Sequence, residues 1–120
     1  IENKKIYFID GNDLELNYVY KKAKLYVCSS LYEGFGLPVI ESQKVNSRIL
    51  LSDIPVLREI SNNEGIFYNH NNIEDFVSKL RHALLSKTEK IVYKNKLLER
   101  SWKLFVNDFE DLFFAILDKK

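Results

Sequence analysis

Two glutamates separated by seven residues bracket the segment of this sequence that could do chemistry. Glu33 and Glu41 stand on either side of residues 34–40, a run that contains two glycines and Pro38. Glycine lets a ligand approach the backbone closely, and proline suits a first helical turn because its missing N–H would have no partner there. The pattern therefore predicts a loop that opens a helix. We expect free N–H groups around Leu37, Val39 and Ile40 to hold an anion such as a diphosphate.

The two carboxylates suit different parts of one ligand. A carboxylate accepts hydrogen bonds from paired vicinal hydroxyls, which is how the ribose of a nucleotide is commonly held. Glu33 and Glu41 cannot share a helix face, because the loop and Pro38 lie between them. We expect both to point into one cleft at the strand ends, one toward a sugar and the other toward a ribose. The plainer alternative is a solvated loop carboxylate and a second one that complements a helix dipole.

The elements that must position this segment follow from the apolar pattern. Four short runs rich in β-branched or aromatic residues are typical of strands buried on both faces: 6–9, 25–28, 49–51 and 66–68. Helical spacing appears between them, most clearly after an Asn72 cap, and earlier after an Asp13 cap. Pro38 and Pro55 mark two further helix starts. The alternation predicts an α/β, Rossmann-like parallel sheet of about four strands flanked by helices.

The last part of the sequence has helical spacing only. Its final helix is apolar around most of its circumference, and a chain of this size has little left to cover such a helix. We therefore expect a core at residues 1–86 and a helical tail at residues 87–120, which packs on the core or on a missing part. The apolar residues of this last helix are Phe105, Phe109, Leu112, Phe113, Phe114, Ile116 and Leu117.

Composition excludes several classes of function. The 120 residues include 18 Lys and Arg against 17 Asp and Glu, a formal net charge of +1. The chain therefore has no strong positive electrostatic field that would attract nucleic acid. Cys28 is the only cysteine, which excludes an intrachain disulfide and a multi-cysteine metal site, and a reducing cytoplasm fits best. Cys28 itself is expected to be a buried small apolar residue. The sequence starts at Ile1 and contains no Met, so we expect a piece of a longer protein.

Glu33 and Glu41 reproduce an E-x7-E signature, and the Gly-Phe-Gly-Leu-Pro-Val-Ile between them resembles the same stretch of retaining glycosyltransferases of the GT-B fold, family 4. Residues 23–30 resemble the Ala-Asp-x-x-x-x-Pro-Ser strand of that family. Further matches are Ser52, Asp53, Glu59 and the pair Ser101-Trp102. Two turns depart from the family: residues 46–49 replace its Gly-Thr-Pro-Val, and residues 10–13 displace its glycine. Asn46 can still form a turn, since Asn tolerates the left-handed conformation.

The resemblance implies the donor-binding part of a transferase that moves a sugar from a nucleotide-diphosphate sugar to a glycan or lipid-linked acceptor, with retention and without a metal or other cofactor. Residues 1–86 would be an incomplete C-terminal domain, whose partner is a missing N-terminal acceptor-binding domain. The parent protein would act in the cytoplasm, at the inner face of the membrane and in peripheral contact with it. Glu33 would be catalytic, and the donor would be bound by Gly34, Phe35, Gly36, Leu37 and Glu41.

Two other readings stay open. The isolated chain is expected to be inactive. Alternatively, it could be a non-catalytic, standalone Rossmann-like interaction module that self-associates through its apolar C-terminal helix. A phospho-acceptor module of another doubly wound fold would need an acidic cluster at the strand ends. Asp10 and Asp13 are too isolated to supply that cluster.

Overall fold

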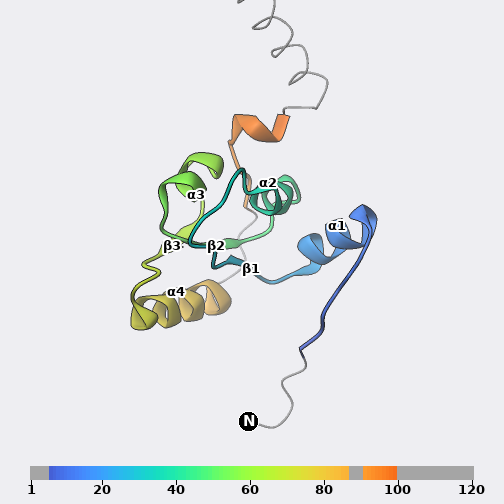
Figure 1. Cartoon of the computed structure of the whole chain (residues 1–120). Coiled ribbons are helices and arrows are strands. Elements are labelled where there is room, and N and C mark those ends of the chain that lie inside the picture. The colour runs from blue at the N-terminus through green and yellow to red at the C-terminus, as the bar shows by residue number, and fades with distance from the viewer. Residues whose placement is uncertain (1–5, 87–90, 100–120) are drawn as a thin grey trace, which may run out of the picture.

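Residues 6–86 and 91–99, which the computed structural model describes, fold around a parallel sheet of three strands (Figure 1). The strands β1 (Tyr26–Cys28), β2 (Ile49–Ser52) and β3 (Ile66–Tyr68) lie side by side in that order. Tyr26 pairs with Ile49, and Leu50 pairs with Ile66. Because the strands are parallel, all three carboxyl ends lie at the same edge of the sheet. The α/β class and the last three predicted strands are therefore confirmed.

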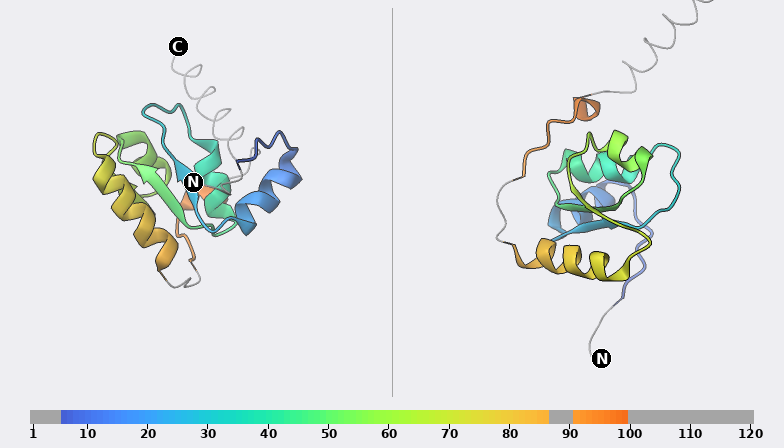
Figure 2. Two further views of the ribbon diagram at one scale, coloured as in Figure 1. Left: turned by 90° about the horizontal axis from the view of Figure 1, so that it is seen from below. Right: turned by 90° about the vertical axis from the view of Figure 1, so that its left-hand side faces the viewer.

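Within residues 6–86 and 91–99, four α-helices and one short 3-10 helix accompany the sheet. They are α1 (Asp13–Lys22), α2 (Leu37–Lys44), α3 (Pro55–Ile60), α4 (Ile73–Leu85) and the 3-10 helix η1 (Lys96–Glu99). Helices α2 and α3 cover one face of the sheet and α4 covers the other, whereas α1 packs against α2 (Figure 2). Pro38 and Pro55 lie in the first turns of α2 and α3, as predicted. Asn72 caps α4 by accepting hydrogen bonds from the Glu74 and Asp75 amides.

The core lies between the sheet and the α2–α3 layer. All four residues of β2 are buried, as expected for a central strand with neighbours on both sides. Cys28 is 7% exposed, which confirms that it is a buried residue. The buried apolar cluster consists of Cys28, Val39, Ile40, Ile49, Leu51, Ile54, Leu57 and Ile60.

The predicted strand at residues 6–9 is wrong, and the described sheet has three strands instead of about four. All four side chains are exposed, and Phe8 reaches 98%. A strand needs a neighbour that pairs with its backbone N–H and C=O groups, and no described strand pairs with this segment. The apolar pattern of residues 6–9 predicts a buried strand, but it does not identify the neighbouring element that would bury it.

The predicted Asp13 cap of the first helix is also wrong, because Asn12 has that role. The Asn12 side chain accepts hydrogen bonds from the Leu14 and Glu15 amides, while Glu15 accepts one from the Asn12 amide at 2.9 Å. This reciprocal arrangement is a capping box, and together these bonds satisfy three amides that a helix start otherwise leaves without partners. Asp13 is the first helical residue, where its charge complements the helix dipole.

Residues 91–99 are the described part of the tail predicted at 87–120, and they pack on the core. Residues 91–95 are not helical, and two of their side chains hydrogen-bond to the core. Tyr93 donates to the Ser47 carbonyl at 2.7 Å, and the buried Asn95 amide donates to Gln43 Oε1 at 2.8 Å and to the Ile60 carbonyl at 2.6 Å. The apolar helix predicted beyond residue 100 lies outside the described residues.

Candidate functional site

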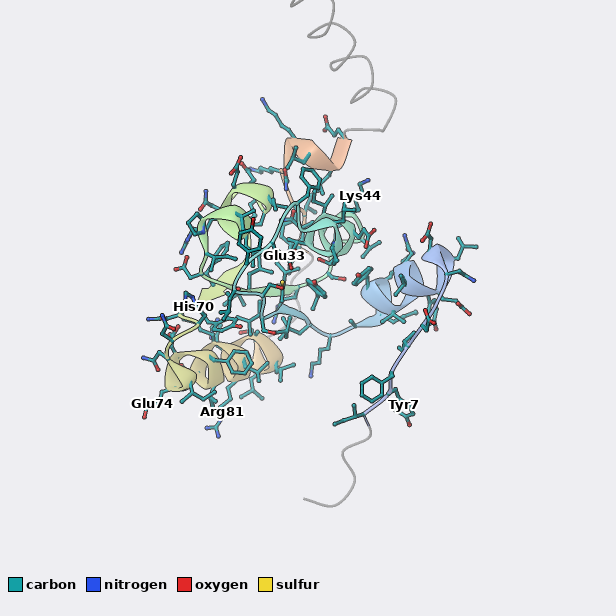
Figure 3. The ribbon with its side chains drawn as sticks, in the orientation of Figure 1. Tyr7, Glu33, Lys44, His70, Glu74 and Arg81 are labelled. Atoms are coloured by element: carbon teal, nitrogen blue, oxygen red, sulfur yellow. The ribbon has the colours of Figure 1, made fainter. Side chains whose placement is uncertain are left out.

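The loop between β1 and α2 lies at the carboxyl edge of the sheet, where open α/β sheets bind their ligands. Ser30 Oγ donates to Glu33 Oε1 at 2.6 Å. The Ser30 carbonyl accepts a hydrogen bond from Ser52 Oγ, and the Cys28 thiol donates to Ser30 Oγ at 3.6 Å. Cys28 and Ser52 are the last residues of β1 and β2. The ends of two neighbouring strands therefore hold the loop that carries Glu33 (Figure 3).

Glu41 lies on α2, exposed to solvent and facing Tyr20 of α1. The pKa of Tyr20 is raised by burial, and further by the charge of Glu41 and a hydrogen bond to it. The Tyr20 ring meets the Tyr26 ring edge-on, with 5.5 Å between centroids. Burial is the main cause that raises the pKa of Tyr26, and the charge of Glu33 contributes least. Glu41 therefore lies beside Tyr20, at the contact between α1 and α2.

The structure explains only one of the two glycines of the loop. Gly36 has φ 63°, in the left-handed region, and a Cβ there would lie 3.1 Å from Ile60 Cδ1. The fold therefore requires glycine at position 36. Gly34 lies outside the positive-φ region, and a Cβ there would meet nothing within 4 Å. Neither the backbone nor the packing of the described residues accounts for glycine at position 34.

The start of α2 offers fewer free amides than the sequence predicted. The Val39 amide donates to the Gly36 carbonyl at 3.0 Å and is not available to an anion. Left-handed Gly36 turns the chain so that the first turn closes with a tight, three-residue hydrogen bond. The side chains of Phe35 and Leu37 remain largely exposed beside this turn, at 56% and 48%.

The two cavities described for this chain lie away from the loop. One, of about 280 Å³, includes the first residues of β2 and β3, Ile49 and Ile66, and so lies at the opposite edge of the sheet. The other, of about 360 Å³, lies between residues 9–11 and α1. Glu33 and Glu41 line neither of them. The cleft that would receive both carboxylates therefore stays a prediction.

Asp53, which follows β2 at the same edge of the sheet, is engaged in a structural ion pair. Arg58 Nη2 lies 2.7 Å from Asp53 Oδ2, and a second contact joins Nε to the other carboxylate oxygen. The hydrogen bond from Arg58 lowers the pKa of Asp53. The Arg58 guanidinium also lies 4.3 Å from the centroid of the Phe67 ring. The pair joins the residue that follows β2 to the last turn of α3.

The described residues contain neither a metal cluster nor a membrane span. No group of three or more His, Cys, Asp and Glu side chains among them could hold a metal ion. In the same part of the chain, no helix is both long and apolar enough to cross a bilayer.

The sequence matched Ser30 and Ser52 to the family pattern without a role for either, and it marked neither Tyr20 nor Tyr26 as part of the site. The Ser-x-x-Glu spacing of Ser30 and Glu33 could have indicated their contact, because short polar side chains often bond three residues along in turns. Ser52 and the two tyrosines come from other elements. No local pattern marks them as neighbours of the loop.

Comparison with known proteins gives a family match over most of the chain. Residues 2–98 match the family model of the glycosyl transferases group 1. Over 68 residues, 57% of this chain, the sequence is 35% identical to the O-antigen chain mannosyltransferase RfbU of Salmonella typhimurium (strain LT2), and the match covers 19% of that protein. Over 72 residues, 60% of this chain, it is 29% identical to O-antigen chain mannosyltransferase B of Escherichia coli, again covering 19%.

A third relative is the serotype-specific mannosyltransferase WbdA of Escherichia coli, 35% identical over 72 residues, which are 60% of this chain and 9% of WbdA. The matched stretch thus spans about a fifth or less of each of these three relatives. No solved structure matches the chain significantly.

Proposed function

This chain belongs to the group 1 glycosyl transferases, and on that premise we propose that it forms the donor-binding part of a retaining GT-B enzyme. The enzyme would transfer a sugar from a nucleotide-diphosphate sugar to a glycan or lipid-linked acceptor, without a metal. The isolated chain would not catalyse transfer, because the N-terminal acceptor-binding domain would have to supply the other wall of the site. The parent protein would act in the cytoplasm, at the inner face of the membrane.

The observation that carries this proposal is the unexplained glycine at position 34. The loop is fixed by the Ser30 hydrogen bonds at the edge of the sheet where ligands bind, yet the fold leaves open space where a Gly34 side chain would stand. A ligand that lies against the backbone there would account for the glycine. Gly36 carries no such information, because its conformation and packing already require glycine.

We propose the roles of the site residues from the resemblance of the E-x7-E segment. Glu33, held by Ser30, would lie near the donor sugar, and Glu41 would accept hydrogen bonds from the ribose hydroxyls. The backbone of Gly34, Phe35, Gly36 and Leu37 would line the donor between them. The names of the relatives favour a mannosyl donor and an O-antigen polysaccharide as the product.

The direct test is a titration of this chain with UDP, GDP and ADP and with their mannose and glucose conjugates. NMR shifts confined to Gly34, Gly36 and Glu41 on saturable binding of one nucleotide would support the proposal. Glu41→Gln should weaken that binding about tenfold or more, the effect of removing a hydrogen bond to a charged group. Glu74→Gln is the matched control, because Glu74 is an exposed carboxylate in the first turn of α4, on the other face of the sheet (Figure 3).

Glu33 is tested in the full-length parent protein, where transfer can be measured. Glu33→Gln should lower kcat more than it weakens donor binding, because its role lies in the transition state. Equal donor affinity and equal transfer rates in the wild type and in both glutamate variants would contradict the assignment of roles. Failure of a well-folded chain to bind any of these nucleotides at millimolar concentration would contradict donor binding by this part alone.

A further inference from the structure

The Ser30 side chain bonds to the Glu33 carboxylate, and nothing in the family match assigns a role to Ser30. The distance of 2.6 Å from Ser30 Oγ to Glu33 Oε1 lies in the range of charge-assisted O–H···O⁻ bonds. We infer that Ser30 is a positioning residue, which holds the Glu33 carboxylate in one orientation for sugar transfer. This inference rests on the proposed function of Glu33.

The Ser30 hydroxyl has a second hydrogen-bond partner at the end of β1. The Cys28 thiol donates to Ser30 Oγ at 3.6 Å, a normal length for a sulfur donor. Because an ionised carboxylate can only accept, the Ser30 hydroxyl donates its proton to Glu33. Cys28 is buried at the end of β1, whereas Ser30 and Glu33 are half-buried. The three groups form a chain that runs from the core to the edge of the site.

The backbone of Ser30 is fixed independently of its side chain. Its carbonyl accepts a hydrogen bond from Ser52 Oγ, and Ser52 is fully buried at the end of the central strand. The Glu33 carboxylate is therefore oriented by the sheet, although Glu33 itself lies in a loop. A carboxylate that is misoriented by a fraction of an ångström lowers the rate more than the affinity, because the reaction depends on alignment.

A purely structural role for Ser30 makes a different prediction. Serine often bonds three residues along to stabilise a turn, and such a bond would support the loop whatever Glu33 does. Loss of the bond would then lower donor affinity and kcat together, because the whole loop carries the donor. A positioning role requires the effect to be confined to kcat and to depend on Glu33.

The experiment measures kcat and donor KM in the full-length enzyme for Ser30→Ala, for Ser30→Thr and for the neighbouring Ser29→Ala. Ser30→Ala should lower kcat about tenfold, which corresponds to about 1.4 kcal/mol, with donor KM unchanged. Ser30→Thr, which keeps the hydroxyl, should restore most of the rate. Ser29 is exposed and adjacent, so Ser29→Ala should behave as the wild type. Thermal unfolding of each variant shows whether the fold is intact.

A double-mutant cycle with Glu33→Gln separates the two roles. If Ser30 acts through Glu33, Ser30→Ala should add no further loss of kcat in the Glu33→Gln background. An added tenfold loss in that background, or a wild-type kcat in Ser30→Ala alone, would overturn the inference and leave the proposed function standing. Absence of transfer by the wild-type enzyme with every donor would instead overturn the proposed function.

Discussion

Replacing Gly36 with alanine should destabilise the chain, whereas the same change at Gly34 should not. At φ 63° an alanine is in the left-handed region, which costs about 1–2 kcal/mol. Its Cβ would lie 3.1 Å from Ile60 Cδ1, closer than ordinary contact, and Ile60 is buried against the sheet. Overpacking of this kind costs about 1–3 kcal/mol. Together these terms predict a loss of about 2–5 kcal/mol in the free energy of unfolding.

Gly34→Ala is the matched control in the same loop. Its backbone is outside the left-handed region, and its Cβ would enter open space. Alanine there should be neutral or should stabilise by up to about 0.4–1 kcal/mol, because it restricts the unfolded chain. If a ligand lies against this glycine, the same variant should nevertheless bind the nucleotide sugar more weakly. Stability and binding would then change in opposite directions.

Urea unfolding followed by circular dichroism measures both variants against the wild type. With a slope of about 1–3 kcal/mol per molar urea, Gly36→Ala should lower the midpoint by about 0.7 M or more. A Gly36→Ala midpoint equal to that of the wild type would refute the reasoning about Gly36. A Gly34→Ala midpoint as low as that of Gly36→Ala would refute the distinction between the two glycines.

Two further predictions concern residues 91–99. Asn95→Ala should cost about 1–3 kcal/mol in urea unfolding, because the buried Gln43 Oε1 loses its donor, while Lys96→Ala, an exposed neighbour, should not; equal midpoints would contradict this. Tyr93→Phe removes the bond to the Ser47 carbonyl and should cost about 1 kcal/mol near neutral pH. Burial raises the pKa of Tyr93 to about 12 from an unfolded value near 10. The contribution of Tyr93 to the free energy of unfolding should be complete below about pH 10 and should fall as pH rises through 12. The difference in the free energy of unfolding between wild type and Tyr93→Phe should therefore narrow over this range. A difference that stays constant with pH would be contrary evidence.

The sequence alone was sufficient for the elements whose signals are local. Continuous apolar runs located all three observed strands, because a strand buried on both faces needs no polar alternation. Asn72 and the two prolines located helix starts, since capping and the missing proline N–H act within one turn. The left-handed turn at Asn46 was also confirmed, with φ 58°. The roles of Glu33 and Glu41 stay predictions.

Only the tertiary structure decided where partners from distant parts of the chain meet. Residues 6–9 have the pattern of a strand, but periodicity does not name a neighbour, and none of the described strands pairs with them. Asn12, and not Asp13, caps the first helix, because the backbone conformation before the helix decides which of two adjacent polar residues is the cap. Ser52 reaches the Glu33 loop from another strand, 22 residues beyond Ser30. The sequence thus determined which residues could form a site, while packing between separate elements determined how Glu33 is held.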